Sequence, residues 1–154
     1  MLIYPIVKWI HILCAIVSLG ANLTYFPWFI RAAKNRESLV FTLSTIRILD
    51  NWIANPSYVL AYITGEIMMR VGGAIHYSTP WMTVALGLYV VVSILGLFMY
   101  APLLKKQQTL AETKGPDDAE YLRVARNGII LGTLIVILTI CITFFMVAKP
   151  ALWS

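Results

Sequence analysis

The sequence predicts an all-α membrane protein: a four-transmembrane-helix antiparallel bundle with a short amphipathic segment before helix two. Two observations predict this class. Hydrophobic residues make up 60% of the 154 residues and charged residues only 12%, whereas a soluble domain has about 25% charged residues. Long apolar runs also recur four times along the chain, separated by short stretches that hold most of the charges. We expect a single transmembrane domain over residues 1–154.

Apolar runs give the helices in order. Residues 9–30, 81–104 and 127–148 are uncharged runs of more than 20 residues, and such a length at ~1.5 Å per residue crosses a hydrocarbon core of ~30 Å. The remaining run, residues 48–69, lies second along the chain and is interrupted by Asp50 and Glu66. The predicted transmembrane helices are therefore about 5–30, 48–71, 80–104 and 118–148.

The second helix is the least regular. Asn55-Pro56 is typical of a helix start, with an N-cap followed by proline at the first helical position. An amphipathic helix is expected before it, because apolar and polar residues alternate at helical spacing: Leu39, Leu43, Ile46, Leu49 and Ile53 against Thr42, Arg47, Asp50 and Asn51. This segment either lies in the membrane interface or continues into the membrane through a kink near Pro56.

The loop before the fourth helix carries a break and a cap. Gly115-Pro116 interrupts the helical pattern. Asp117 with Glu120 three residues later is typical of a capping box. The sequence therefore predicts that the fourth helix begins near residues 117–118 and extends below the membrane before crossing it.

Basic residues set the expected orientation. Nine of them lie in the first and third loops, and the opposite side has three. The positive-inside rule then places both termini on the outer face of a bacterial cytoplasmic (inner) membrane, in a multi-pass protein. The same placement at helix ends excludes nucleic acid as a partner and leaves membrane lipid as the neighbour of the basic groups.

Polar and small residues recur along one face of each helix, which predicts the faces that turn away from lipid. These faces carry Lys8, His11, Ala15, Ser18, Asn22 and Tyr25; Tyr58, Tyr62, Glu66 and Arg70; Tyr89, Ser93, Gly96 and Tyr100; and Gly132, Thr139 and Thr143. Gly128 and Gly132 form a small-xxx-small pattern that favours close helix packing.

One cluster of charged and ligating residues is expected at the outer end of the bundle. Lys8 and His11 share a helix face, as do Glu66 and Arg70, and antiparallel helices bring the two pairs to a similar depth. Glu66 and Arg70 are expected to form a structural ion pair, because a carboxylate at this depth is costly unless it is paired.

Three interpretations of this cluster remain open. The first is a buried ion-pair network. The second is a b-type haem with His11 as axial metal ligand. The other cofactor-binding residues would then be His76, Met69 or Met146 on the opposite face of the haem, and Lys8 or Arg70 beside the haem propionates. The third is a copper or proton pathway through His11, Cys14, Glu66 and methionines.

Several strings also resemble a known family: Lys8-Trp9-Ile10-His11, the block 50–56, Thr64-Gly65, Pro80-Trp81 and the closing 146–150. Together they resemble a family of bacterial integral membrane proteins of unknown function. That family is distantly similar to copper-resistance D-type proteins and to the four-helix protoporphyrinogen oxidase that binds b-haem. The resemblance implies a four-helix membrane fold and a haem or metal site at His11. It does not extend to the oxidase activity, because residues 81–104 lack the expected basic residue.

The function expected from these observations is a redox or electron-transfer role with haem b. The alternatives are a non-enzymatic structural or accessory subunit of a larger membrane complex, or a copper or proton pathway protein. The small size and the Gly128 and Gly132 pattern are also compatible with a homo-oligomer. Whether the protein is an enzyme stays open.

The orientation is testable with reporter fusions. We expect a C-terminal alkaline phosphatase fusion after Ser154 to be active, because this enzyme folds only outside the cytoplasm, and a fusion near Thr113 to be inactive. Activity near Thr113 with none after Ser154 would reverse the predicted topology.

Overall fold

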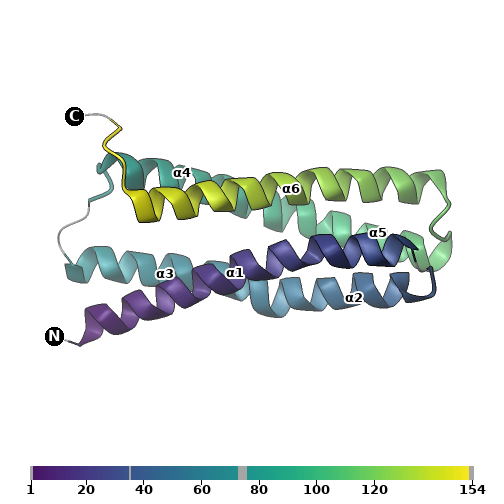
Figure 1. The fold of residues 1–154 in the computed structure, drawn as a ribbon, viewed down its shortest axis with the longest axis horizontal. Helices are drawn as coiled ribbons and strands as arrows, with labels where there is room; N and C mark the ends of the chain where they lie inside the picture. Colours follow the sequence, from purple (N-terminus) through teal and green to yellow (C-terminus); the bar gives the residue numbers. More distant parts are fainter. Residues whose placement is uncertain (1, 35, 73–75, 153–154) are drawn as a thin grey trace.

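The computed structural model describes residues 2–34, 36–72 and 76–152, and these residues form helices and connecting turns with no strand. Residues 3–34, 39–72, 80–113 and 119–148 form four helical rods, numbered in chain order. The rods lie side by side and alternate in direction, with both termini at the same end of the bundle (Figure 1). In order, the elements are α1 (Ile3–Lys34), η1 (Arg36–Ser38), α2 (Leu39–Leu49), η2 (Asp50–Ala54), α3 (Asn55–Gly72), α4 (Pro80–Ile94), η3 (Leu95–Tyr100), α5 (Ala101–Thr113) and α6 (Ala119–Ala148).

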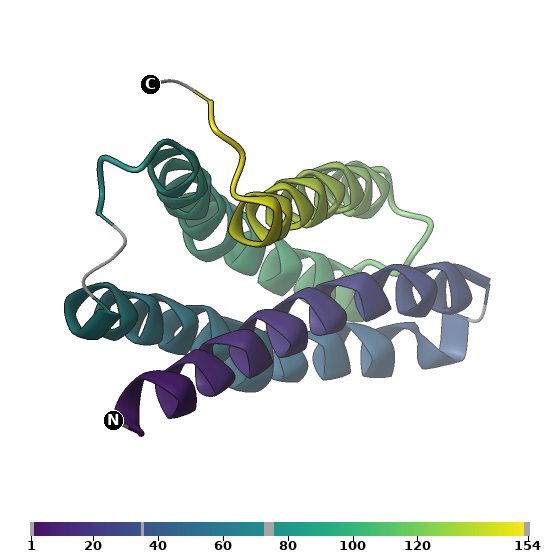
Figure 2. The same cartoon turned by 60° about the vertical axis from the view of Figure 1, so that its left-hand side comes forward.

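Three helical segments of the described chain are long and apolar enough to cross a membrane: Ile3–Lys34, Pro80–Thr113 and Ala119–Ala148. The segment α2–η2–α3 does not meet both criteria. It nevertheless lies beside the other three as one continuous rod (Figure 2).

The second rod differs from the expected helix start at Asn55. Asn55 has helical backbone angles, with φ −62° and ψ −46°, so it is not an N-cap. Its N–H donates to the carbonyl of Asp50, five residues back, which is the hydrogen bond of a π-helical turn. A second π-helical turn occurs in the third rod, where the N–H of Ala101 donates to Gly96. Helix therefore continues through Pro56 from residue 39 to residue 72.

The third rod is longer than its apolar run. It begins at Pro80, directly after Thr79 in an extended conformation, and proline at this position has a φ that suits a helix start. It continues as α5 to Thr113, so most of the predicted third loop is helical.

A tight turn joins α5 to α6. Gly115 has φ 86°, a left-handed conformation that glycine adopts without a Cβ clash. The N-cap of α6 is Asp118, whose carboxylate accepts from the amides of Glu120 and Tyr121; the expected cap at Asp117 was one residue too early. Lys114 Nζ lies 2.8 Å from the Glu120 carboxylate, and this hydrogen bond raises the pKa of Lys114.

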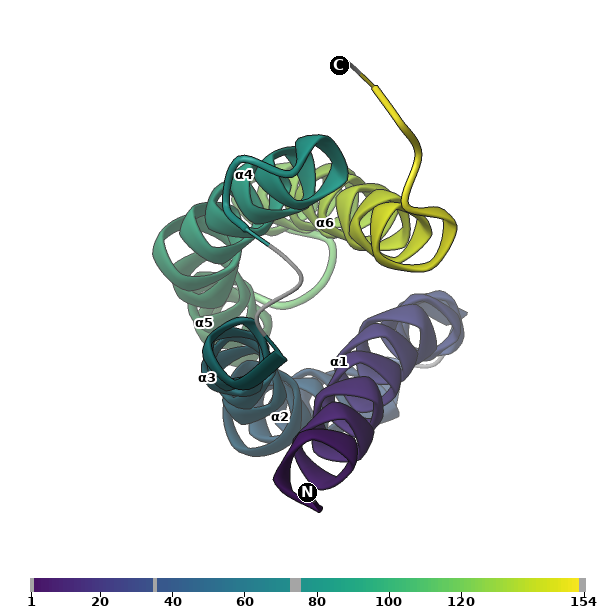
Figure 3. The same cartoon turned by 90° about the vertical axis from the view of Figure 1, so that its left-hand side faces the viewer.

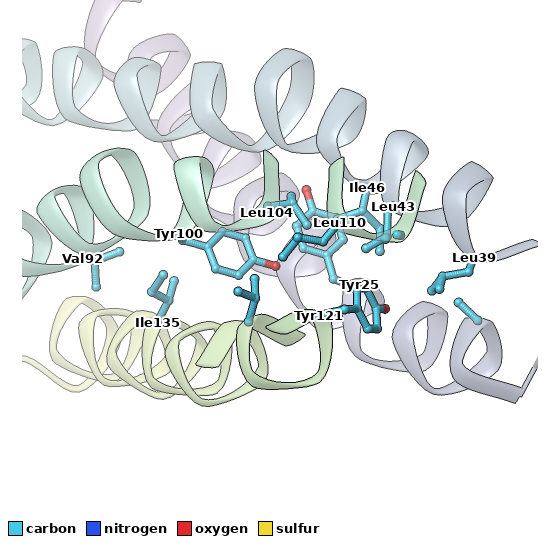
Figure 4. Packing of buried hydrophobic residues seen from close by; sticks show 13 residues of the cluster. Tyr25, Leu39, Leu43, Ile46, Val92, Tyr100, Leu104, Leu110, Tyr121 and Ile135 are labelled. Carbon is cyan, nitrogen blue, oxygen red and sulfur yellow. The ribbon is translucent and has the colours of Figure 1, made fainter. Parts of the chain in front are cut away.

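The hydrophobic core lies mainly in the half of the bundle away from the termini (Figure 4). Leu43 and Ile46 of α2 are 0% and 1% exposed. Tyr25, Tyr100 and Leu104 from the other rods are in the same cluster. This half is thus closed by ordinary side-chain packing.

Towards the termini the bundle separates into two helix pairs, α1 with α3 and α4 with α6 (Figure 3). Among the described residues, no Cα of α3 lies within 8 Å of a Cα of α4 or α6. Backbones this far apart can be joined only by long side chains, and this requirement shapes the candidate site.

The position of the core predicts which apolar side chains of α2 hold the fold. Leu43→Ala should lower stability by about 2–5 kcal/mol, because it leaves a cavity among packed side chains. Phe41→Ala is the matched control on the same helix, since Phe41 is 70% exposed. Thermal unfolding in mild detergent measures the stability of both variants. Equal losses of stability in Leu43→Ala and Phe41→Ala would contradict this position of the core.

Candidate functional site

Tyr58 of α3 joins the separated helix pairs through hydrogen bonds. Its hydroxyl accepts from Asn22 Nδ2 of α1 at 3.3 Å and lies 3.1 Å from Thr139 Oγ1 of α6. Because the Thr139 hydroxyl already donates to the carbonyl of Ile135, Tyr58 is the donor in the second bond. The hydroxyl of Tyr89 from α4 donates to the Tyr58 carbonyl at 3.0 Å. Tyr58 thereby connects all four rods.

A partly enclosed cavity of about 60 Å³, lined by several polar side chains, lies beside this bridge. Residues from α1, η2, α3, α4, η3 and α6 line it, and its polar side chains are those of Asn22, Asp50, Asn55, Tyr58, Tyr89, Ser93 and Tyr100. One enclosed water needs about 10–15 Å³ and two or more polar partners. The cavity therefore has both the room and the polarity for a few water molecules.

Asp50 is the only acidic residue among those lining the cavity. It is 6% exposed, and Asn55 Nδ2 donates to its Oδ2 at 3.2 Å. Within the described part of the chain, Asp50 forms no ion pair within 4.0 Å. A buried carboxylate with one amide partner and no cation is typical of a functional position in a membrane protein.

Asp50 also lines a second, open hollow of about 390 Å³. Arg47, Asp50 and Asn51 form one wall, and residues of α5, including Lys105, form the other. We call this hollow the Arg47–Lys105 groove. Asp50 thus lines both a groove with basic residues and a partly enclosed cavity with several polar side chains.

Both π-helical turns contribute to the cavity. Asp50 comes from η2, and Gly96, Leu97 and Tyr100 come from η3. A π turn widens the helix and changes which side chains face inward. Such turns within α-helices are frequent at functional sites.

His11 lies towards the other end of the bundle and is held by α3. Its Nδ1 is 2.8 Å from the carbonyl oxygen of Ala61 and 3.1 Å from Thr64 Oγ1. A carbonyl only accepts, so Nδ1 carries the proton and Nε2 of the neutral ring keeps a free lone pair. The acceptor of His11 is a backbone carbonyl and not Glu66.

Glu66 has Tyr77 as a neighbour in addition to Arg70, its expected ion-pair partner. The hydroxyl of Tyr77 donates to its carboxylate at 2.7 and 2.6 Å, and this hydrogen bond raises the pKa of Tyr77. Arg70 Nε lies 3.9 Å from Glu66, with the Arg70 side chain 81% exposed. No hydrogen bond or ion pair joins Glu66 to Lys8 or His11 in the described residues.

Among the described residues, no hydrogen bond joins His11 to the other predicted ligands His76, Met69 or Met146. The amide of His76 donates to Thr79 Oγ1 in the loop before α4. Met69 lies on α3 and Met146 near the end of α6. No group of three or more His, Cys, Asp or Glu residues suited to a metal occurs among the residues that are described.

Residues 5–150 match the model of a family described as predicted integral membrane protein (DUF2269). The chain belongs to this family. No curated protein and no solved structure matches the chain. Membership of the family supports a place in the membrane and assigns no activity. A relationship with copper-resistance D-type proteins or the haem-binding oxidase is not shown.

In this family member, sequence reasoning identified the polar faces that line the cavity but placed Asp50 on the outward polar face of an amphipathic helix. The signal that points to Asp50 is the pair Asp50 and Asn55 within an apolar run. Five residues is the spacing that a π turn brings together, whereas an α-helix pairs residues three or four apart.

Proposed function

We propose that α2–η2–α3 is a fourth crossing of the membrane. Its outer surface carries exposed apolar side chains, among them Trp52 at 78%, Phe41 at 70% and Ile48 at 58% exposure. Contact between these apolar side chains and water would be unfavourable, whereas contact with lipid tails would not be. The excess of basic residues in the loops away from the termini supports an orientation with both termini on the outer face of a bacterial cytoplasmic membrane.

The function that the geometry supports best is proton movement through the bundle, with Asp50 as the group that takes up and releases the proton. One observation carries this proposal: a buried carboxylate lines both an open groove and a partly enclosed cavity that holds several polar side chains. In the proposed step, Asp50 accepts a proton from the groove side and passes it to water or a hydroxyl in the cavity. The carboxylate is regenerated, so no other reactant is consumed.

Polar groups continue from Asp50 along the same rod. Tyr58 lies eight residues further on, roughly 12 Å at 1.5 Å per residue, and Glu66 lies sixteen residues further on, roughly 24 Å. Thr64 and His11 lie between them. The two carboxylates are thus separated by most of the ~30 Å hydrocarbon thickness, with hydroxyl, amide and imidazole groups between.

Proton flux into liposomes tests the role of Asp50. We expect vesicles containing the purified wild-type protein to acidify when a potential is imposed, as read by an enclosed pH-sensitive dye. Asp50→Asn should reduce the flux to that of empty vesicles, because an amide cannot carry the proton.

Glu112→Gln is the matched control, since Glu112 is an exposed carboxylate on α5 whose loss leaves the cavity unchanged. Wild-type flux at the level of empty vesicles, or unchanged flux in Asp50→Asn, would overturn the proposal. A structural or accessory role would then be the better description.

A second candidate function is a redox role with b-type haem, supported by the geometry of His11. A ligating histidine usually donates its other ring N–H to an acceptor that fixes the ring, and Ala61 supplies that acceptor. His11 therefore fits the part of one axial ligand through Nε2, and haem bound there would supply one-electron chemistry. His76, Met69 and Met146 remain the proposed second ligands, with Lys8 and Arg70 at the propionates.

Haem binding predicts a b-type absorbance in protein purified from haem-replete cells. His11→Ala should abolish that absorbance, because it removes the iron ligand. Glu66→Gln should leave it largely intact, because Ala61 and not Glu66 orients the ring. Wild-type protein that carries no haem would rule out this candidate, and one visible spectrum decides it.

A further inference from the structure

The Arg47–Lys105 groove has a charge pattern that the proton pathway does not explain. Arg47 is half-buried and Lys105 is exposed. Neither of these two cations forms an ion pair or a hydrogen bond through its side chain within the described residues. Asp50 in the same groove bonds to Asn55. The groove therefore holds two uncompensated cations and one carboxylate.

Two basic residues close to Lys105 in the sequence are paired with an acidic residue of the protein. Lys106 Nζ, from the next residue on α5, lies 2.8 Å from Glu120, and Lys114 Nζ lies 2.8 Å from the same carboxylate. Their charges are balanced within the protein. Lys105 has no such partner among the described residues, so its charge and that of Arg47 in the groove are left for an external anion.

The position of the groove indicates where that anion comes from. Lys105 directly follows the uncharged run 81–104, so it lies at the boundary between the hydrocarbon core and the headgroups. Ala101, Pro102 and Leu104 add an apolar wall beside the charges. Trp52, exposed on the adjoining η2, is the residue type that concentrates at this boundary. A ligand with one anionic group and an apolar part suits these surroundings.

We propose that the Arg47–Lys105 groove binds the phosphodiester headgroup of an anionic membrane lipid. Arginine pairs with phosphate oxygens through its planar fork, and lysine adds a point charge. Basic pockets between transmembrane helices are a known way of holding such headgroups. With Asp50 ionised the groove carries one net positive charge, which matches a lipid with one negative charge. The groove volume of about 390 Å³ lies within the usual range of ligand sites.

Binding of phosphatidylglycerol to the full-length protein in detergent tests this inference by native mass spectrometry. We expect wild-type protein to retain phosphatidylglycerol in preference to phosphatidylcholine. Replacing both cations, Arg47→Gln with Lys105→Gln, should weaken phosphatidylglycerol binding about 25-fold, at about fivefold for each charge. Arg47→Lys should give a smaller loss, because it keeps the charge and removes the fork.

The matched control is Arg123→Gln with Arg126→Gln, which removes two exposed charges outside the groove. An equal loss in this control would overturn the inference, because the effect would then be general surface attraction. Equal retention of phosphatidylcholine, or displacement of the lipid by millimolar inorganic phosphate, would overturn it as well. Asp50 is unchanged in all these variants, so the result is independent of the proton-flux experiment.

Discussion

The structure depends on hydrogen bonds that cross a gap too wide for backbone contact. Tyr58 of α3 supplies them, because its hydroxyl reaches Thr139 on α6 and Tyr89 of α4 reaches back to its carbonyl. Asn22 of the adjacent α1 holds the Tyr58 hydroxyl in place. Lipid cannot replace these bonds, so the polar groups have nowhere else to be satisfied. The length of the tyrosine side chain keeps the helix pairs apart. The cavity is the space that this separation leaves.

The other half of the bundle is closed by apolar packing. The π turns lie between this packed half and the half that contains the cavity. η2 follows the buried face of α2 at Leu43 and Ile46. η3 precedes Leu104 of α5. Each π turn shifts the inward face of its rod relative to a regular α-helix. Asp50 continues the inward face of Leu43 and Ile46, and the π turn brings Asn55 beside it at the cavity.

Polarity patterns predicted much of this arrangement from the sequence. Ser18, Tyr25 and Tyr100 are buried as the polar faces implied, because small and hydrogen-bonding residues are costly against lipid. The burial of Asp50 follows from helical spacing, because Asp50 lies four residues after Ile46 and seven after Leu43, on the same side of the helix. Assigning Asp50 to the opposite, polar face by its charge was wrong. The hydrogen-bond partner of His11 could not be predicted. A backbone carbonyl is present at every residue, so no side-chain pattern points to Ala61.

The energetics of Asp50 argue that it is retained for a function. A buried carboxylate is costly even when an arginine or lysine pairs with it, and apolar residues of similar size often give equal or greater stability. Among the residues that the structure describes, Asp50 has only the Asn55 amide within hydrogen-bond distance, and Arg47 and Lys105 share its groove without pairing with it. A purely structural role would be filled more stably by an asparagine or a leucine. The position therefore makes physical sense where the charge itself, or the proton that neutralises it, is what the protein uses.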